Sequence, residues 1–268
     1  MSEKAYQWDA NTYARHSSAQ YEWARELIDK LHLRGHESVL DIGCGDGKVT
    51  ALLAERVPNG RVTGIDRSEN MVAFARQSFP PESYANLTFE QMDAGRITFE
   101  NQFDVIFSNA TLHWIKDHRA VLGGVQRSLK PGGRILFQMG GRDNAREIVA
   151  AIDRLRALPA WKTYFHDFAF PYGFYGPEEY AGWLADAGLR ERRAELVFKD
   201  MKHQGADGLA GWLRTTWLPY IERVPQELRE RFIAEIVATY LQAHPLDEQG
   251  LTHVDMIRLE VEADKPGW

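Results

Sequence analysis

Apolar residues first follow a helical period and then gather into short runs. Trp23, Leu27 and Leu31 recur every four residues, which predicts an amphipathic helix that Gly35 ends. Buried strands that alternate with helices are typical of a mostly parallel sheet with helices on both faces, and therefore of an α/β domain. The strands predicted from the apolar runs are Ser38 to Ile42, Arg61 to Ile65, Leu87 to Gln91, Phe103 to Asn109 and Arg134 to Met139.

After Gly141 the regular alternation of short apolar runs and helical segments ends. Helices are predicted at 143–158, 177–187, around 205–221 and 226–243, and further strands at 191–198 and 254–262. We interpret the chain as a sheet domain whose later connections are enlarged into a helical cap. The predicted parts are an N-terminal helical lid at 1–34, a ligand-binding core at 35–142, a substrate cap at 143–190 and 199–253, and the last strands of the core sheet at 191–198 and 254–268.

The composition argues against several classes of protein. Of 268 residues, 44% are hydrophobic and 26% are charged, which is ordinary for globular proteins and not for disordered chains. The formal net charge is −6, whereas proteins that bind nucleic acid or anionic membranes usually present a basic face. The single cysteine, Cys44, forms neither an intrachain disulfide nor a metal cluster by itself. The single cysteine favours a reducing, cytoplasmic setting, and the net charge argues against nucleic-acid partners. Because no signal-type or membrane-spanning apolar run is present, we also expect no membrane partner. We expect no metal, since no zinc-binding HExxH pattern occurs.

The most informative segment is VLDIGCGDGKVT, in which a strand runs into Gly43, Gly45 and Gly47 and then into a helix. Glycines at such a turn permit positive φ and close approach of a ligand, although a tight turn without a ligand uses the same residues. A dinucleotide fingerprint would need glycine or alanine at the position of Lys48, and Asp46 would repel a diphosphate. The loop better suits a ligand that brings a cation. S-adenosylmethionine carries a sulfonium and an ammonium group and no phosphate.

Three further carboxylates are placed to meet such a ligand. Asp41 ends the first strand, where it would face the positive amino group directly or through water. Asp66 follows the second strand about 20 residues beyond the loop, the distance at which an acidic side chain accepts hydrogen bonds from ribose hydroxyls. Asp93, in FEQMDA, is either an acceptor for an adenine amino group or an ordinary turn or N-cap residue.

In these segments the chain resembles the class I S-adenosylmethionine-dependent methyltransferases. The likeness covers about residues 36 to 140 in order, through VLDIGCGDG, VTGID, FEQMDA, FDVIFSNATLHWI and LKPGGRILF. It implies a Rossmann-like seven-stranded sheet with one antiparallel strand, the cofactor across the carboxyl ends of the strands, and no metal. It further implies that Gly43, Gly45 and Gly47 line the methionine part, Asp66 holds the ribose, Met71 packs on the adenine and Asp93 receives its amino group. Asp41, Arg67, Ala94 and Asn109 complete the predicted cofactor-binding set.

A narrower likeness reaches the flanks of this core. The stretch NATLHWIKDHRAVL and the N-terminal WDANTYARHSSAQYEWA are similar to trans-aconitate methyltransferases and juvenile hormone acid methyltransferases, which esterify carboxylates of small molecules. In that group a glutamine and a tryptophan help to orient the acceptor carboxylate, and the positions that match are Gln20 and Trp114. The likeness is diffuse across the cap, and biotin-pathway carboxyl methyltransferases share the tryptophan signature, so the acceptor itself is not identified.

The expected function is O-methylation of a carboxylate on a small-molecule acceptor, with S-adenosylmethionine as cofactor. A carboxylate is ionised at neutral pH and needs no base, and indole and carboxamide N–H groups can orient it. His113 is the candidate base if the acceptor were a phenol or an amine, and is otherwise a structural histidine. The alternatives are methylation of nitrogen, carbon or phenolic oxygen, a sensor that binds the cofactor without turnover, and a nicotinamide dehydrogenase.

Overall fold

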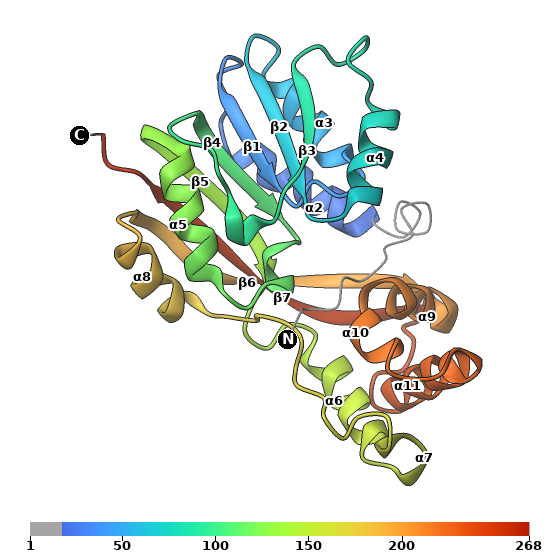
Figure 1. Cartoon of the computed structure of the whole chain (residues 1–268). Helices are drawn as coiled ribbons and strands as arrows, with labels where there is room; N and C mark the ends of the chain where they lie inside the picture. The colour runs from blue at the N-terminus through green and yellow to red at the C-terminus, as the bar shows by residue number, and fades with distance from the viewer. Residues whose placement is uncertain (1–17, 268) are drawn as a thin grey trace. The chain divides into compact units, whose positions relative to one another are not determined.

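The computed structural model describes residues 18–267, with side chains described from residue 23 onward. A seven-stranded sheet lies at its centre, in the order β3-β2-β1-β4-β5-β7-β6 (Figure 1). The Rossmann-like fold predicted from the sequence is therefore confirmed. The strands are β1 (Ser38–Ile42), β2 (Arg61–Asp66), β3 (Leu87–Gln91), β4 (Phe103–Asn109), β5 (Leu129–Gly140), β6 (Arg190–Gln204) and β7 (Leu251–Asp264).

Parallel pairing brings the carboxyl ends of the early strands to one edge of the sheet. β1 lies between β2 and β4 and is parallel to both, β3 is parallel to β2, and β5 is parallel to β4. β7 is antiparallel to β5, with Gln138 opposite Glu260 and Gly140 opposite Arg258. Arg258 in the middle of β7 therefore lies beside the carboxyl end of β5.

Helices cover both faces of the sheet because each presents one apolar stripe to it. On one face lie α2 (Ser18–Lys30), α3 (Lys48–Arg56) and α4 (Glu69–Ser78), which bury their apolar residues in one core cluster. On the other lie α5 (His118–Ser128) and α8 (Pro177–Asp186), which pack in a second cluster around Phe103, Phe137 and Met139. Short 3-10 turns η1 (Ala94–Arg96) and η2 (Leu112–Trp114) follow β3 and β4.

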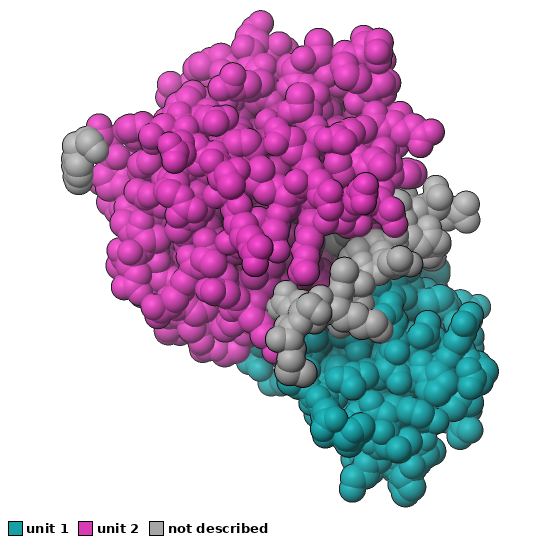
Figure 2. Space-filling view, viewed as in Figure 1, with its two compact units in different colours: residues 1–6, 143–171, 198–257 teal, residues 7–142, 172–197, 258–268 magenta. Residues whose placement is uncertain are grey.

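The described residues divide into two compact units (Figure 2). The sheet unit comprises 18–142, 172–197 and 258–267, and the helical unit comprises 143–171 and 198–257. The helical unit contains α6 (Arg146–Arg156), α7 (Pro159–Lys162), α9 (Gly205–Thr216), α10 (Leu218–Ile221), η3 (Gln226–Leu228) and α11 (Arg229–Ala243).

The structure corrects the sequence interpretation at the cap boundary and at the bounds of the later strands, where β6 runs to Gln204 and β7 begins at Leu251. Residues 172–190, which we assigned to the cap, belong to the sheet unit, because α8 buries Tyr180 and Leu184 in the core beside α5. β5 also begins five residues earlier than predicted. Leu129 pairs with Phe103 before the Pro-Gly-Gly stretch, which the strand accommodates as a register shift with Gly132 at φ +79°.

Candidate active site

The loop after β1 is fixed by hydrogen bonds from both neighbouring strands. The backbone N–H groups of Gly43 and Cys44 donate to the Ile65 carbonyl of β2, at 2.7 and 3.0 Å. On the other side, the Ser108 hydroxyl of β4 donates to the Ile42 carbonyl at 2.8 Å. The loop is thus held at the carboxyl ends of three adjacent strands, where open α/β sheets bind ligands.

All three loop glycines have positive φ, but the surroundings that a side chain would meet differ between the three positions. A Cβ on Gly43 would lie 2.1 Å from the Thr111 methyl, and one on Gly47 would lie 2.8 Å from the Phe89 ring. Those two glycines therefore serve close packing within the protein. A Cβ on Gly45 would meet no atom within 4 Å, so Gly45 alone faces open space that a ligand can enter.

Carboxylates surround this loop. Burial and the nearby charges of Asp41, Asp66 and Asp46 raise the pKa of the Cys44 thiol well above its ordinary value. A protonated, buried thiol is a poor nucleophile. Burial, together with the charge of Asp66, raises the pKa of Asp41 to about 7, although the Thr50 hydroxyl donates to its carboxylate at 2.7 Å. Such a cluster would gain from a bound cation and would repel a phosphate.

Asp66 holds the loop and keeps acceptor capacity. One carboxylate oxygen accepts the Gly45 N–H at 3.1 Å, the other accepts the Ser68 N–H at 2.8 Å, and the Arg67 backbone N–H also interacts with the carboxylate. A carboxylate has about four acceptor positions, so these bonds leave room for a ribose hydroxyl. Burial raises the pKa of Asp66 from its ordinary value.

The residues predicted to surround the adenine follow β2 and β3. Met71 and Ala94 are buried, and the Met71 N–H donates to the side chain of Ser68, which caps α4. Asp93 accepts from the Gly95 N–H at 2.8 Å and caps η1, so it performs the turn role that the sequence left open. Arg67 lies 3.9 Å from the Asp93 carboxylate.

An aromatic cluster follows β4 within the sheet unit. His113 and Trp114 lie on η2, and the segment after residue 171 places Tyr172 and Phe174 beside them. The Tyr172 and Phe174 rings stack at 5.1 Å between centroids, and Tyr172 meets the half-buried Trp114 edge-on at 5.0 Å. The Gly173 N–H donates to the His113 carbonyl at 2.8 Å, which fixes the segment in place. The site therefore combines an acidic loop with a wall of aromatic rings.

Both histidines near this wall are buried. The Gly140 N–H donates to His113 Nδ1 at 3.3 Å, so this ring nitrogen acts as an acceptor. Burial, with the charge of Arg258, lowers the pKa of His113 well below its ordinary value. His118 contacts the Tyr180 hydroxyl at 2.7 Å and two backbone carbonyls, and it serves the packing of α5 and α8. Among residues 18–267, no group of three or more His, Cys, Asp or Glu side chains is arranged to hold a metal.

The remaining predicted site residues lie as follows. Asn109 is half-buried at the end of β4, opposite Gln138 of β5. Gln20 belongs to α2, but its side chain lies outside the described residues. Sequence reasoning missed Tyr172 and Phe174. The available signal was weak, because aromatic residues occur throughout 161–175 and their spacing does not say which rings meet Trp114.

Fold and site together define a class of protein that binds a cationic nucleoside at the carboxyl edge of a Rossmann-like sheet. The residues fit S-adenosylmethionine on the structure's own evidence, because Gly45 opens to space and three carboxylates meet at the loop. No helix within residues 18–267 has the length and apolar character needed to span a membrane.

Comparison with known proteins agrees with this class. The family model described as "Methyltransferase domain" matches residues 33–188. The trans-aconitate 2-methyltransferase of Methylobacterium nodulans is 30% identical over 266 residues, covering 94% of this chain and 96% of the relative. A putative methyltransferase from Bacillus halodurans superposes with a TM-score of 0.61 at 17% identity, covering 91% of this chain and 98% of that one.

A third similar protein is a phosphoethanolamine N-methyltransferase of Haemonchus contortus, solved with phosphomonomethylethanolamine and S-adenosylhomocysteine. It superposes with a TM-score of 0.60 at 20% identity and covers 96% of this chain and 57% of that one. At such identities the two solved structures show the fold alone. The chain belongs to the class I S-adenosylmethionine-dependent methyltransferases, and S-adenosylmethionine is its cofactor.

Proposed function

We propose that this enzyme transfers the methyl group of S-adenosylmethionine to a carboxylate of a small molecule and forms a methyl ester. The cofactor supplies a methyl group activated on sulfonium. The carboxylate oxygen gains the methyl carbon as the carbon–sulfur bond breaks, leaving S-adenosylhomocysteine. Because the acceptor is already an anion at neutral pH, this transfer needs no proton removal.

The observation that carries the proposal is the state of His113. Its Nδ1 accepts a backbone hydrogen bond, and burial with the charge of Arg258 holds its pKa well below the ordinary value. A base of that kind takes a proton poorly from a phenol or an ammonium group, because efficient proton transfer needs a pKa near the working pH. An ionised acceptor avoids this problem. The fold likeness to an N-methyltransferase carries no such argument about the acceptor.

The chain's own residues would bind and align the two reactants. We assign the loop of Gly43, Gly45 and Gly47 to the methionine part, with Asp41 toward its ammonium group, and Asp66 to the ribose. Met71, Ala94, Asp93, Arg67 and Asn109 are assigned to the rest of the cofactor site. The aromatic cluster would exclude water, so that neither the sulfonium nor the carboxylate stays fully solvated during transfer.

Trp114 and Gln20 are the proposed contacts to the acceptor. An indole N–H and a carboxamide N–H can hold one carboxylate oxygen without protonating the other. His113 then supports Trp114 as a packed neighbour, at 5.6 Å between ring centroids, and does not act as a base. The helical unit, 143–171 and 198–257, is the proposed acceptor-selecting cap.

Turnover on a panel of acceptors tests the function directly. Trans-aconitate belongs in the panel because relatives carry its name, beside other di- and tricarboxylic acids, a phenol and an amine. We expect methyl esters from one or more acids and no product from the phenol or the amine. Methylation of the phenol or the amine alone would contradict the proposal.

Trp114→Phe tests the assigned acceptor contact. The change removes the indole N–H and keeps most of the ring, so we expect the KM for the acid to rise about 5- to 50-fold, the loss of one hydrogen bond to a charged group. The dissociation constant of S-adenosylhomocysteine, measured by calorimetry, should stay within twofold. The reverse pattern would place Trp114 in the cofactor site.

A further inference from the structure

A pocket rich in cations lies at the end of the sheet opposite to the cofactor loop. Its volume is about 320 Å³, and it lies where β5 and β6 begin and β7 ends. From Arg134, which lines the pocket, to Gly140 the strand β5 advances six residues, or roughly 20 Å at about 3.3 Å per residue. None of the lining residues is among those that we assign to the cofactor or the acceptor.

Charged side chains dominate the lining of this pocket. Four cations and two carboxylates give the lining a formal charge of +2. The chain as a whole carries −6, so the pocket departs from the average charge of the molecule. The charged lining residues, all in the sheet unit, are Arg134, Arg190, Arg192, Lys265, Glu262 and Asp264.

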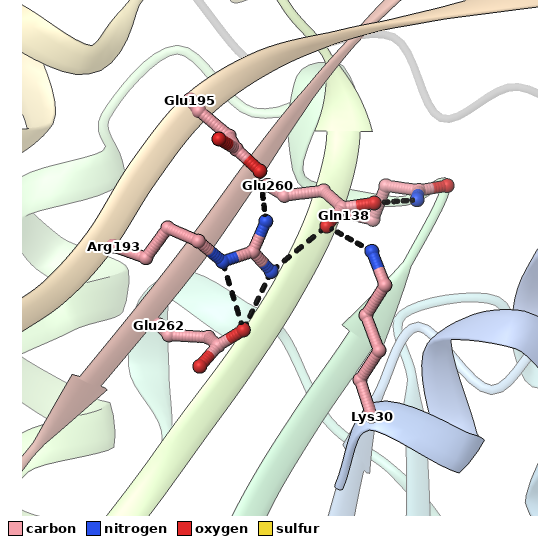
Figure 3. Close-up of polar contacts among 6 residues, drawn as sticks. All are labelled: Lys30, Gln138, Arg193, Glu195, Glu260 and Glu262. Atoms are coloured by element: carbon pink, nitrogen blue, oxygen red, sulfur yellow. Dashed lines mark hydrogen bonds and ion pairs between the residues drawn. The ribbon is translucent and has the colours of Figure 1, made fainter.

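Both carboxylates of the lining are already paired. Asp264 accepts from Arg190 at 2.6 Å and also from the Nε of Arg192. Glu262 accepts two hydrogen bonds from Arg193 of the same sheet unit, at 2.5 and 3.0 Å (Figure 3). The negative charges in the pocket are therefore balanced before an anion enters it.

The other two cations have no carboxylate partner within residues 23–267. Arg134 donates to the Leu31 carbonyl at 2.6 Å. Lys265 donates at 2.8 to 3.0 Å to three neutral oxygens, which belong to Asn101, Gln126 and Leu129. Neutral acceptors orient these two side chains without cancelling their charge, so the positive charge of the pocket stays uncompensated.

Arg192 offers exposed donors to a ligand. Its side chain is 56% exposed, and in the described part of the chain only its Nε is hydrogen-bonded. The two terminal nitrogens of its guanidinium therefore remain available, and such a fork matches phosphate oxygens. A Cβ on Gly132 would meet no atom within 4 Å, so the pocket is also open on the side of β5.

We propose that this pocket binds a small, polar phosphate monoester through its phosphate group. At pH 7 such a group carries a charge of about −1.5 to −2, which matches the charge of the lining. The volume is at the lower end of the range of about 300–1,000 Å³ for small-molecule sites. Ile135 and Ala263 offer little apolar surface, so the remainder of the ligand is polar.

This site is separate from methyl transfer. The carboxylates around the loop after β1 repel phosphate, whereas the pocket attracts it, so the two sites select different ligands. Because the pocket lies at the opposite end of β5, the phosphate monoester is not the methyl acceptor.

The experiment titrates glucose 6-phosphate by calorimetry, at pH 7.5, into full-length protein saturated with S-adenosylhomocysteine. Wild type is compared with Arg192→Gln, Arg192→Lys and Arg119→Gln. Arg119 is the matched control, because its side chain is 66% exposed and it pairs with one carboxylate, that of Asp186, at 3.1 Å. Parallel titrations use inorganic phosphate, citrate, and sodium chloride at equal ionic strength.

We expect wild type to bind one glucose 6-phosphate saturably, and inorganic phosphate more weakly. Arg192→Gln should raise the dissociation constant about 5- to 20-fold, because a charged fork is lost at a site that is partly screened by solvent. Arg192→Lys keeps the charge without the fork and should fall between the two. Arg119→Gln should stay within about twofold of wild type. Asp264 keeps Arg190 in both Arg192 variants, so their affinity for S-adenosylhomocysteine should be unchanged.

Four results would overturn the inference. Wild type that gives no more heat with glucose 6-phosphate than with sodium chloride has no such site. A dissociation constant for Arg192→Gln within twofold of wild type places the ligand elsewhere. Citrate that binds more tightly than glucose 6-phosphate rejects the phosphate class, and inorganic phosphate that binds as tightly rejects the ester. Should Arg192→Gln bind no S-adenosylhomocysteine, Arg192→Lys decides: an unchanged dissociation constant for glucose 6-phosphate rejects the site and a raised one supports it.

Discussion

Asp41 shows how a single residue balances stability against binding. It is 2% exposed, and burial raises its pKa to about 7. A carboxyl with a raised pKa releases its proton at lower pH when unfolded than when folded, so folding becomes less favourable as pH rises from about 4 to about 7. Without a ligand, an ionised Asp41 therefore lowers the free energy of unfolding, and a bound cation would reduce this loss.

Asp41→Asn should remove this cost, because an amide does not ionise and can still accept from the Thr50 hydroxyl. We expect the free energy of unfolding without ligand to rise by about 1–4 kcal/mol at pH 8, and by less at pH 5. Denaturant titrations at both pH values measure this. Affinity for S-adenosylmethionine should fall, because the amide offers no charge to its ammonium group. A variant less stable than wild type at pH 8 would contradict the explanation.

At the scale of elements, the loop between β1 and α3 contains one glycine that is packed against the protein, Gly43, and one that faces open space, Gly45. Gly43→Ala would place a methyl against Thr111 at φ +79°, so we expect a loss of about 1–3 kcal/mol in the free energy of unfolding. Gly45→Ala has room for its methyl, so its loss should be about 1 kcal/mol and its main effect weaker cofactor binding. Thermal unfolding and calorimetry with S-adenosylhomocysteine check both. Equal instability of the two variants would show that the space beside Gly45 is closed.

The end of α2 is joined to β7 through Glu260 (Figure 3). Hydrogen bonds from Lys30, Arg193 and Gln138 outweigh burial and lower the pKa of Glu260 below its ordinary value of 4.5. The stabilisation is fully present above pH 4.5 and is lost as pH falls through the lower folded-state pKa.

Glu260→Gln should therefore reduce the free energy of unfolding by about 1–3 kcal/mol at pH 7, because Lys30 and Arg193 each lose a buried anionic partner. Arg193 keeps its ion pairs with Glu195 and Glu262, which limits the loss. The difference from wild type should shrink below pH 4. Glu195→Gln is the control, since Glu195 is an exposed partner of Arg193 and its loss should cost less than about 0.5 kcal/mol. Urea titrations from pH 3.5 to 7 measure these differences. Equal effects of the two substitutions would reject the special role of Glu260.

At the scale of the whole molecule, ligand binding should stabilise the chain selectively. S-adenosylhomocysteine at 100 times its dissociation constant adds about 2.7 kcal/mol to the free energy of unfolding of the state that binds it. For a chain of this size we expect Tm to rise by about 5–10 °C. NADH at the same concentration should shift Tm by less than about 1 °C, because its diphosphate meets the carboxylates around the loop. A larger shift with NADH would contradict the assignment of the loop.

The fold was largely predictable because its signals are local. The first four strand runs and the turn of three glycines each depend on residues adjacent in sequence, and the structure places them as predicted. The different roles of those glycines were not predictable, since Thr111 and Phe89 meet them only after folding. The cap boundary also failed as a local prediction. The amphipathic pattern of α8 marks a buried face without saying which core it joins.

The sequence by itself determined the class of the protein: a strand–glycine loop–helix with carboxylates in place of phosphate-binding groups is a local chemical pattern. Only the tertiary structure decided which residues from distant segments lie beside Trp114 and at the carboxyl end of β5. Tyr172 meets Trp114 across 58 residues, and Arg258 reaches the same edge through the antiparallel pairing of β7 with β5. Neither of these two contacts can be predicted from neighbouring residues in the sequence, because contacts between distant segments are set by how the sheet is ordered and packed.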